Sequence, residues 1–472
     1  MEKTHFDLVI IGGGPAGYGA ALYGASAGLD IALVEKDKVG GTCLHRGCIP
    51  AKELLETAAV VRAVTHAGDF GVRVEPIGLE WSTTLARKQA VVDKLTAGVT
   101  GLLKNRKVTV LDGTATLGRD RTVTVVGGSA DGTGTETVTL TGDAVILASG
   151  SVPRLIPGFG PGGPVVTSDE FFDIPGVPDR AVVIGGGAIG CEFASTLADL
   201  GASVTILKAL PKILPGCDED VTRVVLQAFR KKDIEVRTGV AVTGHTPKPG
   251  GGTVVSFGDG EQIDTDLVVV SVGRSPFTDG VVAAGTGVKV TERGFFDVDG
   301  YYRTGEPSVW AIGDVIATPQ LAHVGFAEAI CVIHDILGET PVPVDNSRVP
   351  WAIYCQPEVA FAGLSEAAAK EAGHEVMTSK HRFAGNSRAQ ILGETDGLVK
   401  IIAEKRPDGT AGQILGVHMV GPWATEQLSG GYLAVNWEAT VAEVAAFIQP
   451  HPTLTELFGE SVLALTGRSL HG

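Results

Sequence analysis

The sequence predicts an α/β protein with two Rossmann-like domains in tandem, followed by a C-terminal domain of α+β type. Three observations lead to this expectation. A chain of 472 residues is too long to fold around one hydrophobic core. Short apolar runs alternate with helical stretches, which is typical of parallel, doubly wound sheets. One pattern, a buried strand followed by a glycine-rich turn and a helix, occurs twice.

The chain divides into four segments. Residues 1–150 open with that pattern and close on another apolar strand, and residues 151–275 repeat the plan after a connector rich in proline and glycine. Residues 276–348 carry one short strand and are expected to complete the first domain. Residues 349–472 have strand-like runs and helices without the glycine pattern, so they are expected to form the separate α+β domain.

Composition and charge argue against several classes of function. The net charge of −16 disfavours nucleic acid, whose binding depends on Lys and Arg at the phosphates. No apolar run approaches the roughly 18 residues of a membrane span. The apolar start has no basic lead, so it is interpreted as a buried strand rather than a signal peptide, and a cytoplasmic protein is expected. In such a chain six cysteines do not form a structural disulfide framework.

Two glycine motifs predict dinucleotide sites. They are Gly12-x-Gly14-x-x-Gly17 and Gly185-x-Gly187-x-x-Gly190, and each lies between a strand and a helix. The first glycine permits a tight turn, the second lets the backbone approach a diphosphate, and the third lets helix and strand pack closely. The diphosphate then binds free N–H groups at the positive end of the helix.

The residue that ends the second strand of each unit distinguishes the two sites. In the first unit it is Glu35, whose carboxylate is placed to accept hydrogen bonds from ribose hydroxyls. In the second unit it is Lys208, which suits a 2′-phosphate better than a 2′-hydroxyl, with Lys212 as a second cation. The alternative is a Lys208 side chain that simply points to solvent. A nicotinamide nucleotide is expected here, and the choice between NAD and NADP stays open.

A pair of cysteines, Cys43 and Cys48, lies in the segment Gly40–Lys52. In an ideal helix, residues i and i+5 have Cα atoms about 8–9 Å apart, beyond the roughly 7 Å limit for a disulfide. A bond therefore needs a distorted turn, which Gly47 and Pro50 can supply, and distorted exposed disulfides are readily reduced. A zinc site is the rival interpretation, but no second Cys/His pair has finger spacing. Buried inert thiols are expected for Cys191, Cys217, Cys331 and Cys355.

The segment Gly40–Lys52 resembles the redox signature of the class I pyridine nucleotide–disulfide oxidoreductases. Within that family the chain is most similar to the dihydrolipoamide dehydrogenases of the actinobacterial type, and the resemblance covers essentially the whole chain. The further motifs that carry it are Ala148-Ser149-Gly150, Gly185–Glu192, Val272-Gly273-Arg274, Ala311–Asp314, Leu321-Ala322-His323 and His451–Glu456.

The resemblance implies roles for the cysteines and their neighbours. Cys48 faces a flavin, Cys43 exchanges with the substrate disulfide, and Lys52 pairs with Glu192 beside the flavin and the nicotinamide. From the residues alone, Lys52 lies one helical turn beyond Cys48, where it favours the thiolate or is an ordinary solvated lysine.

The resemblance also supplies a base. His451 takes and returns the proton of thiol–disulfide exchange, and Glu456 orients its ring. Considered without the family, Thr453-x-x-Glu456 is equally a helix capping box. Because His451 is far from the cysteines in the chain, the family's homodimer would bring it to the other subunit's site. Residues 349–472 would then be the dimerisation domain.

The implied cofactors are one FAD per subunit and NAD, with NADP as the alternative, and no metal. Besides the first glycine motif, Glu35 and Lys52, the FAD side would comprise Ala115, Ser149, Gly150, Asp314, Ala322 and His323. The nicotinamide side would comprise Gly185, Gly187, Gly190, Lys208, Val242, Gly273 and Arg274.

The implied activity is oxidation of dihydrolipoyl groups with reduction of NAD+, in partnership with the lipoyl-bearing acyltransferase of a 2-oxoacid dehydrogenase complex. Lys208 keeps a second activity open, an NADP-dependent reductase of low-molecular-weight disulfides. Against that reductase, Gly190 is retained and no arginine pair follows the second strand. A mercuric reductase is disfavoured because the last cysteine is Cys355. A non-catalytic scaffold with this fold is disfavoured because every catalytic residue of the family motifs is present.

Overall fold

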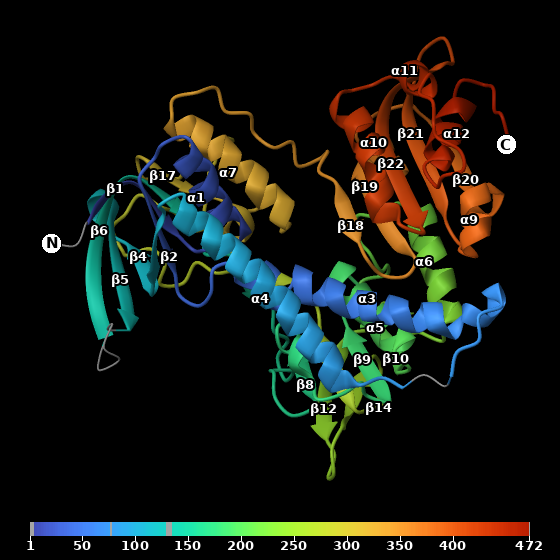
Figure 1. The fold of residues 1–472 in the computed structure, drawn as a ribbon, viewed down its shortest axis with the longest axis horizontal. Helices are drawn as coiled ribbons and strands as arrows, with labels where there is room; N and C mark the ends of the chain where they lie inside the picture. The colour runs from blue at the N-terminus through green and yellow to red at the C-terminus, as the bar shows by residue number, and fades with distance from the viewer. Residues whose placement is uncertain (1–3, 76–77, 129–134, 472) are drawn as a thin grey trace. The chain divides into compact units, whose positions relative to one another are not determined.

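The fold is described from a computed structural model that covers residues 4–75, 78–128 and 135–471 (Figure 1). Two compact units make up the chain, and each is assembled from segments that are far apart in the sequence. The first unit comprises residues 1–53, 82–154 and 273–346. The second unit comprises residues 54–81, 155–272 and 347–472.

A seven-stranded sheet is the centre of the first unit. Its strands are β1 (His5–Ile11), β2 (Ile31–Glu35), β3 (Thr109–Asp112), β4 (Thr114–Leu117), β5 (Thr122–Gly128), β6 (Thr135–Leu147) and β17 (Val309–Ala311). The order is β3-β2-β1-β6-β5-β4. Strand β17 pairs in parallel with the C-terminal end of β6, beyond the part of β6 that pairs with β5. Strands β1, β2, β3 and β6 run parallel, whereas β4 and β5 form an antiparallel extension.

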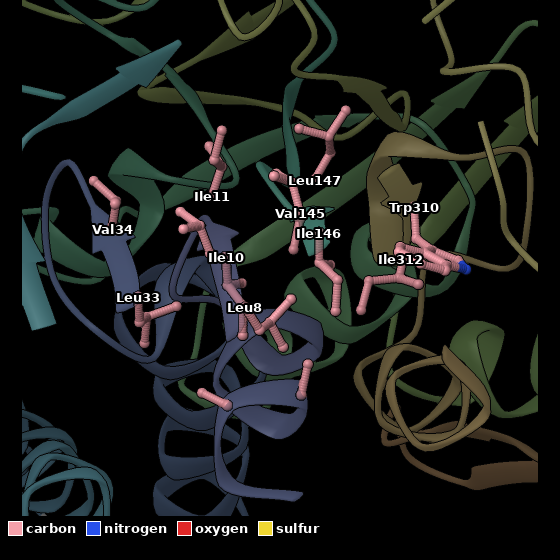
Figure 2. Close-up of a cluster of buried hydrophobic side chains, with 14 of the residues drawn as sticks. Leu8, Ile10, Ile11, Leu33, Val34, Val145, Ile146, Leu147, Trp310 and Ile312 are labelled. Carbon is pink, nitrogen blue, oxygen red and sulfur yellow. The ribbon is translucent and has the colours of Figure 1, made fainter. Parts of the chain in front are cut away.

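The central parallel strands β1 and β2 and the C-terminal end of β6 are largely apolar, because side chains on both of their faces are buried. Figure 2 shows this core, to which β1, β2, β6 and the segment around β17 each contribute residues such as Leu8, Leu33, Ile146 and Ile312. Helices α1 (Pro15–Ser26) and α7 (Ala322–Ile336) pack together, and glycines such as Gly19 allow the close approach, because a Cβ there would lie 2.8 Å from the Phe326 ring.

The other helices of this part of the chain are α2 (Gly41–Arg46), α3 (Cys48–Thr65), η1 (Ala67–Phe70), α4 (Trp81–Asn105), η2 (Arg119–Arg121) and η4 (Gly313–Val315). Of these, η1 and the part of α3 from residue 54 onward belong to the second unit. A small antiparallel pair, β7 (Ser151–Pro153) and β16 (Arg274–Pro276), lies where the chain leaves the first unit and returns to it.

The second unit contains a parallel sheet and an antiparallel sheet of three strands. The parallel sheet has the order β11-β10-β9-β15-β8, from β8 (Val165–Thr167), β9 (Arg180–Ile184), β10 (Ser203–Lys208), β11 (Glu235–Thr238) and β15 (Leu267–Val270). The helices are η3 (Glu170–Asp173), α5 (Ala188–Asp199) and α6 (Glu219–Lys231), and the three-stranded sheet is β12 (Val242–Pro247), β13 (Thr253–Phe257) and β14 (Glu261–Thr265). The predicted tandem of α/β folds is confirmed.

The C-terminal part of the second unit is of α+β type, also as predicted. Its antiparallel sheet has the order β18-β19-β22-β21-β20, from β18 (Trp351–Ile353), β19 (Glu358–Gly363), β20 (Val376–Arg382), β21 (Leu398–Lys405) and β22 (Ala411–Gly421). The helices are α8 (Glu366–Glu371), η5 (Phe383–Gly385), α9 (Ser387–Leu392), α10 (Ala424–Asn436), α11 (Val441–Ala445) and α12 (Glu456–Ala464). Helix α10 packs on β19 and β22, and α12 packs on β20 and β21. None of the helices in the described ranges is long and apolar enough to cross a membrane.

A buried network of charges connects this sheet to helix α6 within the second unit. The Lys400 ammonium on β21 lies 3.0 Å from both carboxylate oxygens of Asp218, 2.9 Å from Asp220 Oδ2 and 2.7 Å from Glu366 Oε2. Asp218 also caps α6 by accepting the Asp220 N–H, and it accepts the Glu366 N–H at the start of α8. The Lys400 side chain is only 3 % exposed, so its charge is compensated by neighbouring carboxylates rather than by water.

Candidate active site

The first glycine motif has the geometry that close approach of a dinucleotide requires. Gly12 has a φ of +106°, and a Cβ at this position would lie 2.3 Å from the Ala148 carbonyl oxygen. A Cβ at Gly17 would lie 1.8 Å from the Gly12 carbonyl oxygen, so helix and turn meet without room for a side chain. Gly14 is different, because no atom lies within 4 Å of its Cβ position. The second glycine therefore leaves the backbone open on the side from which a diphosphate would approach.

The second motif repeats this arrangement residue by residue. Gly185 has a φ of +117°, and its Cβ would lie 2.3 Å from the Ser271 carbonyl oxygen. A Cβ at Gly190 would lie 2.0 Å from the Gly185 carbonyl oxygen, and Gly187 again has no neighbour within 4 Å. In the described part of the chain, no side chain caps the helices that follow, α1 and α5. Their first N–H groups therefore fit the anionic diphosphates of two dinucleotides, such as FAD and a nicotinamide nucleotide.

The two strand-end residues differ, as the sequence predicts. Glu35 ends β2 and is 9 % exposed; its Oε2 accepts the Gly13 N–H at 2.6 Å and its Oε1 accepts the Asp37 N–H at 2.9 Å. This fixed carboxylate beside the open turn suits the adenosine ribose of FAD. Lys208 ends β10 and is half-buried. Lys212, the second cation that the sequence offered, forms an ion pair with Glu219.

The cysteine pair lies on either side of a helix break. Helix α2 ends at Arg46, Gly47 has a φ of −146° and a ψ of −112°, and α3 begins at Cys48. A Cβ at Gly47 would lie 3.0 Å from the Thr42 carbonyl oxygen, so this turn is tightly packed. The distorted turn that the spacing demands is therefore made by Gly47. Pro50 lies in the first turn of α3, where its missing N–H breaks no hydrogen bond.

Cys43 is half-buried and Cys48 is exposed in the single chain. A hydrogen bond with Cys48 raises the pKa of the Cys43 thiol well above its usual range, and burial and the Cys48 charge add to that rise; the charge of Lys52 opposes it. Burial, together with the charges of Cys43 and Cys48, raises the pKa of Tyr18 to about 12. Tyr18 of α1 and Lys52 of α3 are thus close to the pair.

A chain of polar contacts leads from the cysteine segment to Asp314. The Arg274 guanidinium donates to Thr42 Oγ1 at 3.5 Å, to the Ser151 carbonyl at 2.7 Å and, through Nε, to Ser151 Oγ at 2.7 Å. Ser151 Oγ in turn donates to Asp314 at 2.5 Å. Burial raises the pKa of Asp314, and Ser151 and Arg274 oppose that rise. Arg274 therefore belongs to the same unit as the first glycine motif, and its assignment to the nicotinamide side stays a prediction.

Sequence reasoning missed Ser151 and Glu328. Ser151 follows the Ser149-Gly150 motif directly, which is the signal that points to it. Glu328 on α7 is fully buried, and its Oε2 accepts the Gly313 N–H at 2.6 Å, next to Asp314. Burial raises the pKa of Glu328 to about 7. A buried acid in an otherwise apolar helix is the signal that identifies Glu328.

The other predicted residues of the FAD side lie in the first unit. Ala115 is buried on β4, Ser149 Oγ donates to the Phe277 carbonyl at 2.6 Å, and Gly150 has a φ of +78°. Ala322 and His323 are the first two residues of α7.

The predicted residues of the nicotinamide side lie in both units, unlike those of the FAD side. Gly273 has a φ of +111° and its carbonyl accepts the Arg154 N–H, whereas Val242 begins β12. Glu192 on α5 is buried, and its Oε1 accepts the Tyr354 N–H at 2.9 Å. Because Lys52 and Glu192 belong to different units, their pairing stays a prediction.

His451 and Glu456 form the pair that the sequence suggested. His451 Nδ1 lies 2.8 Å from Glu456 Oε1, and the His451 side chain is 68 % exposed. Glu456 Oε2 accepts the Thr453 N–H at 2.8 Å, which is one half of a capping box. The other half is absent in this segment, because Thr453 Oγ1 donates to the Pro450 carbonyl and α12 begins only at Glu456. The Glu456 carboxylate therefore orients the His451 ring with Oε1 and holds the Thr453 backbone N–H with Oε2.

The four remaining cysteines are shielded thiols. Cys191, Cys331 and Cys355 are buried as expected, whereas Cys217 is only partly buried. Burial raises the pKa of each, to about 12 for Cys217 and about 11 for Cys331. None of them has the lowered pKa of a reactive thiol.

Comparison with known proteins places this geometry in context. The family described as pyridine nucleotide-disulphide oxidoreductase matches residues 6–329, and its dimerisation domain matches residues 349–462. The chain is 40% identical over 476 residues to a dihydrolipoyl dehydrogenase of Bacillus subtilis, covering 99% of each chain. It is 38% identical over 471 residues to a dihydrolipoyl dehydrogenase of Thermus scotoductus, covering 99% of this chain and 98% of the relative. The solved structure of LpdA from Mycobacterium tuberculosis matches with a TM-score of 0.88 at 25% identity, covering 98% of this chain and 99% of the other.

Proposed function

Because this chain belongs to the pyridine nucleotide–disulphide oxidoreductase family, we propose that it is a dihydrolipoyl dehydrogenase that oxidises dihydrolipoyl groups and reduces NAD+. The observation that carries the proposal is the Cys43–Cys48 dithiol across the Gly47 break, in the same unit as a dinucleotide turn. When bound, FAD supplies two-electron redox chemistry between a dithiol and a nicotinamide ring.

The cysteines perform the thiol chemistry. A thiolate of the dihydrolipoyl group attacks Cys43 of the oxidised pair, the Cys43–Cys48 bond breaks, and Cys48 leaves as a thiolate. The second substrate thiol then attacks the substrate sulfur of the mixed disulfide, which releases the oxidised lipoyl group and returns the Cys43 thiol. Reoxidation of this dithiol with NAD+ yields NADH and one proton. In the single chain Cys48 is exposed and Cys43 is half-buried, so the assignment of the two roles follows the family and not the exposure of the two side chains.

His451 is proposed to move the proton. It accepts the proton of the attacking substrate thiol through Nε2, since Nδ1 faces Glu456, and it returns the proton to the leaving thiolate. The Glu456 carboxylate fixes the ring orientation and stabilises the imidazolium that forms. In the homodimer, His451 would complete the site of the other subunit, and residues 349–462 match the dimerisation domain of the family.

The partner and the compartment follow from this function. We propose that the partner is the lipoyl-bearing acyltransferase of a 2-oxoacid dehydrogenase complex, because its lipoyl group is the disulfide that this reaction regenerates. We also propose a cytoplasmic location, because Cys191, Cys217, Cys331 and Cys355 are thiols rather than members of a structural disulfide framework.

The test is an assay of the purified holoenzyme with dihydrolipoamide and NAD+, followed by the growth of NADH absorbance. We expect rapid turnover in the wild type, loss of turnover in Cys43→Ser, and full turnover in the matched control Cys217→Ser. A Cys43→Ser variant that still oxidises dihydrolipoamide at the wild-type rate would overturn the proposal.

A further inference from the structure

The two dinucleotide turns differ in one buried contact. In the first turn the Glu35 carboxylate accepts the Gly13 N–H at 2.6 Å. The matching residues in the second turn are Lys208 and Gly186, and an ammonium cannot accept a hydrogen bond. Gly186 is buried, and its N–H has no acceptor among the residues that the structure describes. At this edge of the second site, a cationic side chain therefore replaces the anionic acceptor of the first site, and the N–H of the turn lacks that acceptor.

The rest of the second turn is held as firmly as the first. The Leu214 N–H donates to the Gly186 carbonyl at 2.7 Å, as the Gly40 N–H does to the Gly13 carbonyl at 2.8 Å. The Ile213 side chain also packs on Gly186, since a Cβ there would lie 2.7 Å from Ile213 Cγ2. Because these contacts fix the turn without the strand-end side chain, Lys208 is not needed for its conformation.

Lys208 is also available to bind an anionic ligand. Within the described ranges, no carboxylate lies in ion-pair distance of its ammonium, whereas Lys212 is engaged by Glu219. Strand β10 pairs with β9 in the register Leu207↔Ile184, and the Gly185 N–H donates to the Leu207 carbonyl. Lys208, the last residue of β10, therefore lies level with the start of the turn that contains the open Gly187.

We propose that Lys208 and the Gly186 N–H form an anion site at the adenosine ribose, so that this enzyme accepts 2′-phosphorylated NADP+ besides NAD+. A carboxylate in this position accepts a hydrogen bond from the 2′-hydroxyl and repels a 2′-phosphate, whereas an ammonium attracts the 2′-phosphate. The inference rests on the proposed function, because it concerns which nucleotide receives the electrons of the dithiol. The overall step becomes dihydrolipoyl dithiol plus NADP+ giving lipoyl disulfide, NADPH and one proton.

The first experiment measures binding, so that it does not depend on turnover. Adenosine 2′,5′-bisphosphate and adenosine 5′-monophosphate are titrated calorimetrically into the holoenzyme and into Lys208→Gln, Lys208→Glu and the matched control Lys212→Gln. We expect the bisphosphate to bind the wild type at least 10-fold more tightly than the monophosphate. Lys208→Gln should remove that advantage, Lys208→Glu should invert it, and Lys212→Gln should leave it within threefold. Equal binding of both nucleotides by the wild type would overturn the proposal.

The second experiment compares kcat/KM for NAD+ and NADP+ with dihydrolipoamide. The ratio of NADP+ to NAD+ should fall at least 10-fold in Lys208→Glu. A wild type that discriminates between the bisphosphate and the monophosphate but oxidises no dihydrolipoamide would leave the anion site standing and refute the proposed substrate. A wild type that uses only NAD+, with a ratio that Lys208→Glu does not change, would refute the anion site and leave the dehydrogenase standing.

Discussion

Replacement of Lys400 by methionine tests the buried charge network of the second unit. Removal of one member of a buried ion pair typically costs about 3–5 kcal/mol, because the other charge stays buried without compensation. The cost depends on which carboxylates keep a second partner. Glu366 keeps Lys370, and Asp220 keeps Arg223 and Lys380. Asp218, whose side chain is only 3 % exposed, loses its one ion-pair partner in the described part of the chain.

Two backbone N–H groups still donate to Asp218 in this variant, which reduces the penalty. We therefore expect Lys400→Met to lower the free energy of unfolding by about 3 kcal/mol, the lower end of that range. The matched control is Lys370→Met, which removes an exposed i,i+4 partner of the same Glu366 and should cost about 0.5 kcal/mol or less. Both variants are compared with the wild type by urea unfolding, followed by circular dichroism at one protein concentration because the dimer is concentration-dependent.

The network also predicts a pH dependence. Burial by itself raises the pKa of Asp220, but Lys400 and Lys380 hold it near about 2 in the folded chain, below the ordinary 3.8. A lowered carboxyl pKa contributes stability that is present above the unfolded value and lost as the pH falls through the folded value. The wild type should therefore lose stability between about pH 4 and pH 2 more steeply than Lys400→Met. A Lys400→Met variant within about 1 kcal/mol of the wild type at pH 7 would refute the reasoning.

Three further predictions concern the site. His451→Gln should lower kcat for dihydrolipoamide oxidation by about 10²-fold or more, the usual contribution of a general base, and a wild-type kcat in steady-state assays would contradict that role. Glu35→Ala removes the acceptor of the Gly13 and Asp37 N–H groups, so the purified protein should carry less FAD by flavin absorbance; full occupancy would argue against the assignment. Glu328 has a pKa raised to about 7 from 4.5, so ionising it destabilises the fold as the pH rises through that window. Glu328→Gln still accepts the Gly313 N–H and should gain thermal stability over the wild type between pH 5 and pH 8, whereas a pH-independent difference in Tm would exclude this effect.

Local patterns predicted the parts of the molecule that local geometry determines. The GxGxxG spacing predicted two strand–turn–helix units, because a side chain at Gly12 or Gly185 would collide with the backbone that directly follows the neighbouring strand of the sheet. The Cys-x4-Cys spacing predicted a helix break, because an unbroken helix keeps the two sulfurs apart. His451 and Glu456 are five residues apart, so their contact is also local.

Long-range polar contacts could not be predicted in the same way. Lys400 and Asp218 are separated by 182 residues, and the sequence around either residue does not predict contact with the other. The one local sign is that Lys400 interrupts an apolar strand, Leu398–Ile402, where a solvated lysine would be out of place. Ser151 and Arg274 likewise meet across 123 residues, on two short strands that apolar periodicity does not reveal. The role of Lys208 depended on a missing hydrogen bond at Gly186, which a sequence does not display.

The Gly47 break also has a kinetic consequence for the kind of thiol that this enzyme can use. Cys43 and Cys48 are hydrogen-bonded to each other across that glycine, and Gly47 packs on the backbone of Thr42 and Cys43, so each thiol meets the other at a very high effective molarity. A monothiol that forms a mixed disulfide with Cys43 is therefore expelled by Cys48 before a second monothiol from solution can react. A substrate with its own second thiol can compete with Cys48, because that thiol also attacks the mixed disulfide intramolecularly. We therefore expect the geometry of this one glycine turn to favour the oxidation of dithiols over that of monothiols.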